Sequence, residues 1–265
     1  MYPTAYSLPP TSARRRVLTM PGAALALVVL LHATPVPAGD FADGDAGWTR
    51  YDPLAPHGVS PATFEFPDEN YRIIAGQSHS PAQHGPSRAG SFAPGTTPER
   101  FRATVDLVDW DDSHDQAIGL WARVGTPGFG TTTGYALTYS VGSREINLTR
   151  VTNEAPAANL DESPVVLTRG HRYRLVLTGD GPALVGAVYS FDDLGAPLAT
   201  VGSTDATYAT GAAGLIVFDN TDANTADATF DRFIVTPLPE PGAALTLLVA
   251  VAVLARRAPR RARCR

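Results

Sequence analysis

Lysine is absent from this chain of 265 residues, and cysteine occurs only once. Its one cysteine is Cys264, and all 21 of its basic residues are arginine. With the only cysteine in the last residues, the rest of the chain can form no internal disulfide. Its stability must therefore come from a packed core or from bound ions, and a body of about 200 residues can bury enough apolar surface for this.

Positive charge is scarce in the middle of the chain. Residues 39–238 hold 12 arginines and 25 acidic residues, which gives a net charge of −13. Such a surface repels phosphate backbones and anionic lipids, so we expect no nucleic-acid partner. It suits cations, neutral sugars or simple solubility.

Long apolar runs occur only near the two ends. At the amino end, three arginines at 14–16 precede an apolar run at 21–31 and a polar stretch that ends in Val36-Pro37-Ala38. This order predicts a secretory signal peptide over residues 1–38, cut after Ala38. The alternative is a retained membrane anchor, for which the run is short because a span needs about 20 residues.

Residues 237–265 combine a proline-rich spacer, an apolar segment and an arginine cluster. The spacer contains Pro239-Glu240-Pro241, the apolar segment covers 243–255, and six arginines follow. The order is typical of a membrane helix whose arginines stay in the cytoplasm. Counted from Gly242, the apolar stretch reaches only about 21 Å at 1.5 Å per residue, short of a core about 30 Å thick.

This tail resembles the PEP-CTERM sorting signal of Gram-negative bacteria. The resemblance implies transient insertion in the inner membrane, cleavage by an exosortase-type enzyme near Pro239-Glu240-Pro241, and release to the cell surface or extracellular matrix. An ordinary C-terminal anchor with a chance Pro-Glu-Pro is the alternative.

Residues 39–236 lack helical periodicity and show strand patterns instead. In Phe101-Arg102-Ala103-Thr104-Val105-Asp106-Leu107, apolar and polar residues alternate, as in a half-buried strand. Similar runs, separated by glycine and aspartate turns, occur at 62–66, 71–75, 117–124, 134–141, 144–151, 164–168, 173–177, 183–189, 214–218 and 228–235. We predict an all-β fold of two antiparallel sheets packed face to face, with a barrel as the alternative.

The order of several motifs in this body resembles the concanavalin A-like lectin and glucanase superfamily, including its LamG-like members. The motifs are 41–48, Gly119-Leu120-Trp121-Ala122-Arg123, Tyr135-Ala136-Leu137, 170–175, 208–215 and 228–233. The resemblance implies a jelly roll whose concave face holds carbohydrate in many relatives.

Catalysis is not expected from the acidic residues. Glucanases of that superfamily use two carboxylates on one strand, which alternation places on one face. Here Glu145 has Asn147 and Thr149 as its same-face neighbours, and neither replaces a second carboxylate. A hydrolase of keto-sugars, which the superfamily also contains, remains an alternative function.

Sugar binding is predicted at aromatic residues, whose faces stack on pyranose rings. The candidates are Trp110, Trp121, Tyr135 and Tyr139, with Arg123 and Asn147 as hydrogen-bonding partners. Core packing is the competing interpretation for Trp121 and Tyr135, and Trp110 is the candidate for an exposed platform.

Calcium is predicted as a structural ion, because Ca²⁺ takes six to eight oxygen ligands. The candidate ligands are Asp109, Asp111, Asp112 and Asp115 in one loop. In several jelly-roll proteins an aspartate on the last strand joins an amino-terminal residue at calcium, which implies Asp231 and Asp40 here. Solvated turns are the alternative, since aspartate also favours turns for local reasons.

These features predict an exported surface or matrix protein with a non-catalytic jelly roll that binds extracellular polysaccharide. A glycoside hydrolase and a purely structural surface protein are the alternatives.

Overall fold

The computed structural model describes residues 36–39, 41–78, 81–221 and 225–239, all within one of the chain's two units, residues 33–265. The predicted signal sequence up to residue 35, Asp40, and the tail from Glu240 onward, with Glu240 and Pro241 of the sorting motif, lie outside the described residues. None of the described helices is long and apolar enough to span a membrane.

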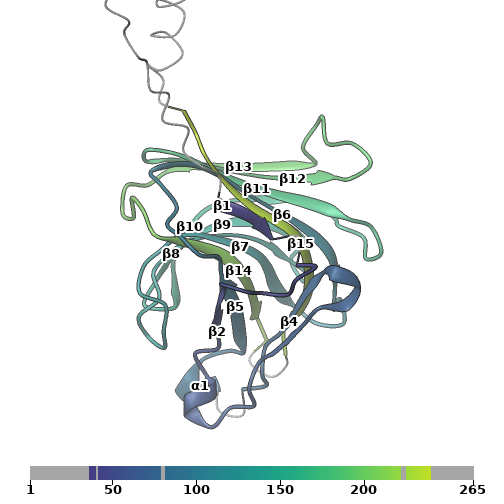
Figure 1. Cartoon of the computed structure of the whole chain (residues 1–265), viewed down its shortest axis with the longest axis vertical. Coiled ribbons are helices and arrows are strands. Elements are labelled where there is room, and N and C mark those ends of the chain that lie inside the picture. Colours follow the sequence, from purple (N-terminus) through teal and green to yellow (C-terminus); the bar gives the residue numbers. More distant parts are fainter. Residues whose placement is uncertain (1–35, 40, 79–80, 222–224, 240–265) are drawn as a thin grey trace, which may run out of the picture. The chain divides into compact units, whose positions relative to one another are not determined.

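Two antiparallel sheets form the domain (Figure 1). The first has eight strands; along its main path they are β13 (Ala199–Thr204), β12 (Ala183–Ser190), β11 (Tyr173–Asp180), β6 (Arg100–Trp110), β15 (Asp227–Pro237), β4 (Tyr71–Ile74) and β3 (Thr63–Glu65), and β1 (Val36–Gly39) pairs with β15 beside this path.

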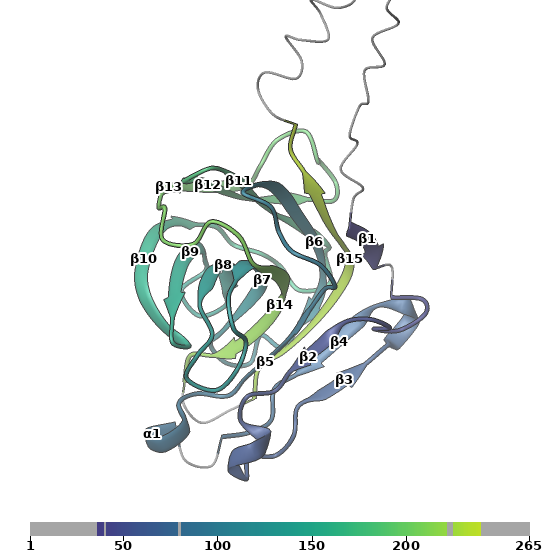
Figure 2. The same cartoon turned by 60° about the vertical axis from the view of Figure 1, so that its left-hand side comes forward.

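The second sheet has seven strands. Their order is β10 (Ala155–Pro164), β9 (Glu145–Thr152), β8 (Gly134–Ser140), β7 (Gln116–Val124), β14 (Ala212–Asp219), β5 (Arg88–Phe92) and β2 (Thr49–Tyr51). Strands β13, β12, β11, β6 and β15 arch over strands β10, β9, β8, β7 and β14 (Figure 2). The predicted two-sheet jelly-roll sandwich is confirmed, and the barrel alternative is excluded because the strands form two separate sheets.

Alternation along the strands builds the core. On β6, Phe101, Ala103, Val105 and Leu107 are fully buried, whereas Arg102 between them is exposed. Val105 lies opposite Leu175 of β11, which is also fully buried. Each buried leucine, valine or phenylalanine contributes about 1.5–3 kcal/mol by leaving water. The many inward-facing side chains of both sheets therefore replace the missing disulfides.

One predicted strand is wrong, and several strands escaped the sequence analysis. The run at 164–168 is not a strand, because Pro164 ends β10 and a loop follows. Strand β10 itself lies at a sheet edge and is largely exposed. Because most of β10 is exposed, its sequence shows no apolar alternation and resembles a loop. The other strands that the analysis did not predict are β1, β2, β5 and β13.

Helices are short in the described residues. They are α1 (Pro81–His84) and the 3-10 turns η1 (Ala55–His57) and η2 (Pro67–Glu69). Strand β1 contains Ala38, so the predicted cleavage point falls inside a strand that pairs with β15. Just after it, Phe41 is 1% exposed and packs against Trp48 and Tyr71 at centroid distances of 5.3 and 4.9 Å.

Candidate functional site

The seven-stranded sheet has one face against the core and one face turned away from it, which we call the groove face. A pocket of about 200 Å³ opens on the groove face. Its lining comes from seven segments, β2, β5, β7, β8, β9, β14 and the start of β10.

An apolar floor forms the middle of this first pocket. Trp121 of β7 lies beside Ala136 of β8, its direct cross-strand partner, and Ile216 of β14 is close by. Tyr51 and Phe92 pack against the Trp121 ring at centroid distances of 5.8 and 5.9 Å. These residues belong to a small hydrophobic cluster separate from the main core. The floor is therefore held rigidly by aromatic contacts.

Uncommitted polar groups lie along one side of the floor. Thr138 of β8 pairs directly with Asn147 of β9, and Thr149 lies two residues further along the same strand. Neither threonine hydroxyl has a hydrogen-bond partner among the described residues, and the Asn147 amide makes one long contact of 3.5 Å with Glu145. Hydroxyl and amide groups that are free in the protein can bind the hydroxyls of a ligand.

Gly119 of β7 occupies a position of the groove face where only glycine fits. It lies between Ile216 and Thr138 in the cross-strand row, and a Cβ atom there would lie 2.1 Å from the carbonyl oxygen of Leu137. No side chain fits at this position without a shift of the backbone.

A buried ion pair borders the pocket at its other side. Arg88 of β5 donates from Nε and Nη2 to Glu154, at 3.0 and 2.8 Å, and the two side chains are 7% and 6% exposed. Glu154 also accepts hydrogen bonds from the Tyr51 hydroxyl and from the backbone N–H of Gly130. Four donated hydrogen bonds satisfy this carboxylate, which offsets the cost of burying it.

The turn before β10 positions Glu154. Asn153 and Glu154 have φ angles of 53° and 64°, so both lie in the left-handed region. A two-residue turn of this kind suits the twist of a hairpin, here between β9 and β10. Asparagine adopts this conformation readily and glutamate does not. The contacts of the Glu154 carboxylate hold it there.

The electrostatics of Glu154 oppose a role in acid–base catalysis. Burial works to raise the pKa of Glu154, but the hydrogen bonds from Arg88, Tyr51 and Gly130 outweigh it and hold the pKa below its ordinary value. A general acid for glycoside hydrolysis needs a raised pKa and a second carboxylate within about 5–10 Å. Glu154 is the only carboxylate among the described residues that line this pocket.

A second pocket continues from the first. It has a volume of about 350 Å³ and shares Arg88, Glu154, Pro156 and Phe218 with the first pocket. Phe129, in the loop between β7 and β8, lines only the second pocket and is 39% exposed. The ion pair thus lies where the two pockets meet.

The predicted sugar-binding residues fall on two different faces. Trp121 and Asn147 line the first pocket. Tyr135 and Tyr139 share a face of β8 with Leu137, which is fully buried between the sheets. Their hydroxyls bond inside the protein: Tyr135 donates to Asp205 at 2.7 Å, and Tyr139 accepts from the Leu167 N–H at 3.3 Å.

Trp110 is not an exposed platform. Its side chain is 3% exposed and packs between Tyr139 and Tyr173, with both centroid distances 6.1 Å. The tryptophan ends β6 on the core side, next to an acidic loop that suggested a solvated position. Burial of a large ring at the end of a sandwich accounts for the difference.

Arg123 also faces the core and is 1% exposed. Its guanidinium donates to three backbone carbonyl oxygens, those of Tyr208, Glu99 and Gly181, at 3.1, 2.6 and 2.7 Å. It lies over the Phe101 ring at 5.3 Å from the centroid. Burial lowers the pKa of Arg123. The residue ties three chain segments together at one end of the sandwich.

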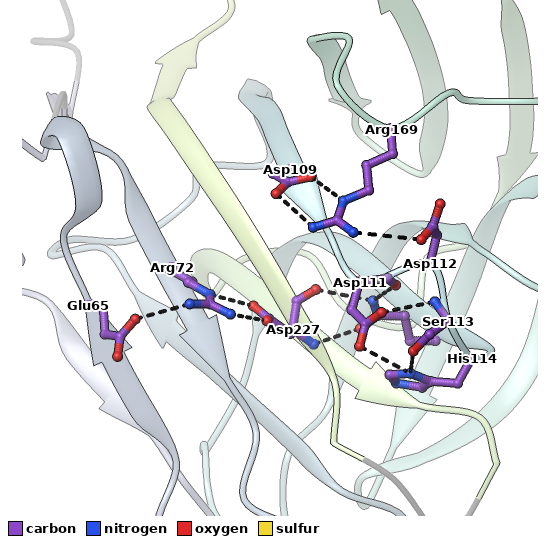
Figure 3. Close-up of polar contacts among 10 residues, drawn as sticks. Glu65, Arg72, Asp109, Asp111, Asp112, Ser113, His114, Arg169 and Asp227 are labelled. Atoms are coloured by element: carbon purple, nitrogen blue, oxygen red, sulfur yellow. Dashed lines mark hydrogen bonds and ion pairs between the residues drawn. The ribbon is translucent and has the colours of Figure 1, made fainter.

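In the predicted calcium loop, the carboxylates of Asp109 and Asp112 are paired with Arg169 and are not free for a cation (Figure 3). Asp109 accepts two hydrogen bonds from Arg169, at 2.8 and 3.2 Å, and Asp112 lies 3.8 Å from the same guanidinium. Asp111 accepts from the Ser113 N–H and lies 3.5 Å from His114. The pKa of Asp109 is lowered, and its hydrogen bonds from Arg169 are the main cause.

The other predicted metal ligands are dispersed. Asp115 accepts hydrogen bonds from Gly142 N–H at 2.7 Å and from Asn220 at 3.2 Å. Asp231 pairs with Arg172 at 2.5 Å, and its proposed partner Asp40 lies outside the described residues. Within the described ranges, no three acidic, histidine or cysteine side chains are grouped as a metal site.

Several residues of the groove were not predicted as site residues. Thr138, Tyr51, Arg88 and Glu154 come from four different segments. Alternation on the predicted strand at 134–141 could have suggested Thr138, because it shares a face with Ala136 and not with the tyrosines. No sequence signal links Arg88 with Glu154, since 66 residues separate them.

Comparison with solved structures shows the fold. The carbohydrate-binding module CBM66 from Bacillus subtilis matches 72% of this chain and 95% of its own, with TM-score 0.51 and 16% identity. A Bacillus subtilis protein of unknown function with a galectin-like fold matches 78% of this chain and 97% of its own, with TM-score 0.56 and 12% identity. The Ca²⁺/Man3GlcNAc-bound exoplasmic/lumenal domain of VIP36 matches 77% of this chain and 89% of its own, with TM-score 0.54 and 11% identity.

At these identities the likeness extends to the jelly-roll fold alone. No family model matches the chain, and no curated protein matches it.

Proposed function

We propose that the domain is a non-catalytic carbohydrate-binding module whose site is the first pocket of the groove face. The observation that carries the proposal is the pairing of an apolar floor at Trp121 and Ile216 with the hydroxyls of Thr138 and Thr149 and the weakly bonded amide of Asn147. A sugar ring offers an apolar face and a rim of hydroxyls, so it complements both parts of this surface. Two of the proteins with the same fold, the carbohydrate-binding module CBM66 and the Man3GlcNAc-bound VIP36 domain, bind carbohydrate, which supports the choice of ligand class.

Direct binding tests the proposal. The full-length chain is screened on a glycan array, and the best neutral glycan is then measured by calorimetry with the wild type and with Thr138→Val/Thr149→Val. Each lost hydrogen bond costs about 0.5–1.5 kcal/mol, so the double variant is expected to bind roughly tenfold more weakly. Thr200→Val is the matched control, because Thr200 is exposed on β13 of the other sheet.

An equal loss of affinity in Thr200→Val would contradict the assignment of the site. Absence of binding to every glycan would instead favour the purely structural surface protein.

The enzyme alternative is tested with the same glycans. Glu154 is the only described carboxylate that lines either pocket, and its hydrogen bonds hold it as a charged group. We expect no release of sugar from any polysaccharide after prolonged incubation. Product formation that disappears in Glu154→Gln would establish a hydrolase.

Calcium binding at the Asp109–Asp115 loop stays a prediction from the sequence. A cation there would have to compete with Arg169 for the carboxylates of Asp109 and Asp112. Thermal unfolding with calcium and with EDTA tests it: a rise of Tm with calcium that Asp109→Asn abolishes would support the ion, and an unchanged Tm would exclude it.

We further propose that the protein is exported and sorted to the cell surface or extracellular matrix of a Gram-negative bacterium. The support is the order of signal peptide, jelly roll, Pro239-Glu240-Pro241, apolar segment and arginine cluster in the sequence. Mass spectrometry of the surface-exposed protein tests it. A mature chain from Gly39 to the vicinity of Glu240 is the expected result, and an intact chain in the cytosol would overturn it.

A further inference from the structure

We propose that the glycan is bound as a chain across both pockets, and that the Arg88–Glu154 pair lies beneath the link between two sugar units. The inference rests on the proposed function and extends it from the class of ligand to its length and charge. It predicts a preference for oligosaccharides over single sugars.

The volumes of the pockets favour a chain. The first pocket, at about 200 Å³, is smaller than the roughly 300–1,000 Å³ that is usual for sites of drug-sized ligands. The second, at about 350 Å³, adjoins it, because four lining residues are common to both. A ligand of two or more sugar units can reach both pockets, whereas a single sugar leaves the second pocket empty.

Phe129 gives the second pocket an aromatic wall. Its ring packs against His57 in a tilted arrangement at a centroid distance of 4.1 Å, and the guanidinium of Arg88 lies 5.7 Å from its centroid. The Phe129 loop is tied to the site, because the Gly130 N–H donates to Glu154 and the Thr132 hydroxyl lies 3.1 Å from the Tyr51 hydroxyl. A partly exposed ring on an anchored loop is a stacking surface for a second sugar.

Charge in the groove indicates a neutral chain. Arg88 and Glu154 are the only charged side chains that line either pocket among the described residues, and they neutralise each other. Residues 39–238 carry a net charge of −13. An anionic polysaccharide would meet no free cation in the groove and would be repelled by the rest of the surface.

Chain length and two single variants separate the pockets. The full-length protein is titrated by calorimetry with mannose, mannobiose and mannopentaose, and with the corresponding glucose series. Phe129→Ala alters only the second pocket, and Asn147→Ala alters only the first. Leu194→Ala is the control for loss of an exposed apolar side chain, since Leu194 is 44% exposed in the loop between β12 and β13.

We expect the pentasaccharide of one series to bind at least tenfold more tightly than its monosaccharide. Phe129→Ala should remove most of this gain and leave monosaccharide affinity unchanged, whereas Asn147→Ala should weaken both ligands. Equal affinity for all chain lengths would overturn the chain proposal. So would a loss of monosaccharide affinity in Phe129→Ala that is as large as the loss of pentasaccharide affinity. In both cases the proposed function stands. If neither series nor any array glycan binds, both proposals fail.

Discussion

Arg88 and Glu154 form a doubly hydrogen-bonded ion pair that is nearly buried, although 66 residues separate them in the chain. Arg88 begins β5, and Glu154 lies in the turn between β9 and β10; strands β14, β7 and β8 come between β5 and β9 in the order of the sheet. The pair therefore fixes one border of the first pocket and, through Gly130, the loop that carries Phe129. The same contact contributes to the stability of the domain and to the shape of its groove.

The first prediction concerns this pair. Glu154→Gln leaves the buried guanidinium of Arg88 without its counter-charge, and breaking a buried pair in this way costs about 3–5 kcal/mol of unfolding free energy. Urea unfolding measures the loss. Glu65→Gln is the control, because Glu65 is 46% exposed in its pair with Arg72 and such surface pairs contribute about 0–1 kcal/mol. Similar losses in the two variants would show that the Arg88 charge is not effectively buried.

Acid should weaken the fold through Asp205. Burial works to raise its pKa, but hydrogen bonds from Thr207, Tyr135 and Arg150 lower it to about 2 from the ordinary 3.8. A lowered pKa in the folded state stabilises the protein above pH 3.8, and this contribution disappears as the pH falls through 2. It amounts to about 2 kcal/mol.

Unfolding free energies measured between pH 5 and 2 test this. Asp205→Asn should be less stable at pH 5 by this amount and should approach the wild type near pH 2. A constant difference between the two proteins over this range would contradict the assignment.

Arg123 should be essential for stability rather than for binding. Arg123→Met removes the donors of three carbonyl oxygens at one end of the sandwich, and each unsatisfied buried group costs about 1–3 kcal/mol. We expect Tm to fall by at least 5 °C, while glycan affinity of the folded fraction is unchanged. Arg102→Met, at an exposed position of β6, is the control, and its free energy of unfolding should stay within about 0.5 kcal/mol of the wild-type value.

Gly119 should be required for the shape of the floor. In Gly119→Ala the new Cβ meets the Leu137 carbonyl oxygen, so β7 and β8 must move apart. Overpacking of this kind costs about 1–3 kcal/mol, and it also shifts Trp121 and Thr138. Gly202→Ala on β13 is the matched control, because its nearest contact would be an ordinary 3.6 Å. Wild-type stability and affinity in Gly119→Ala would contradict this role.

Local pattern was enough to predict the architecture. Alternation at 101–107, and in most of the other runs, identified strands that the structure contains. In a strand with one buried face, every second residue points to the core and is apolar. The edge strands β2 and β10 left no such pattern, because they have little or no core face. The sequence also predicts a signal peptide and a sorting tail, most of whose residues lie outside the described ranges.

Alternation could not decide which face of a strand points into the core between the sheets. Tyr135 and Tyr139 share one face of β8, and Ala136 and Thr138 share the other. The sequence marked the tyrosines as candidates because of their rings, but only the packing of two sheets shows that their face is buried and the small residues line the groove. The meeting of Arg88 with Glu154 likewise depends on strand order, which brings distant segments together and which no local preference encodes.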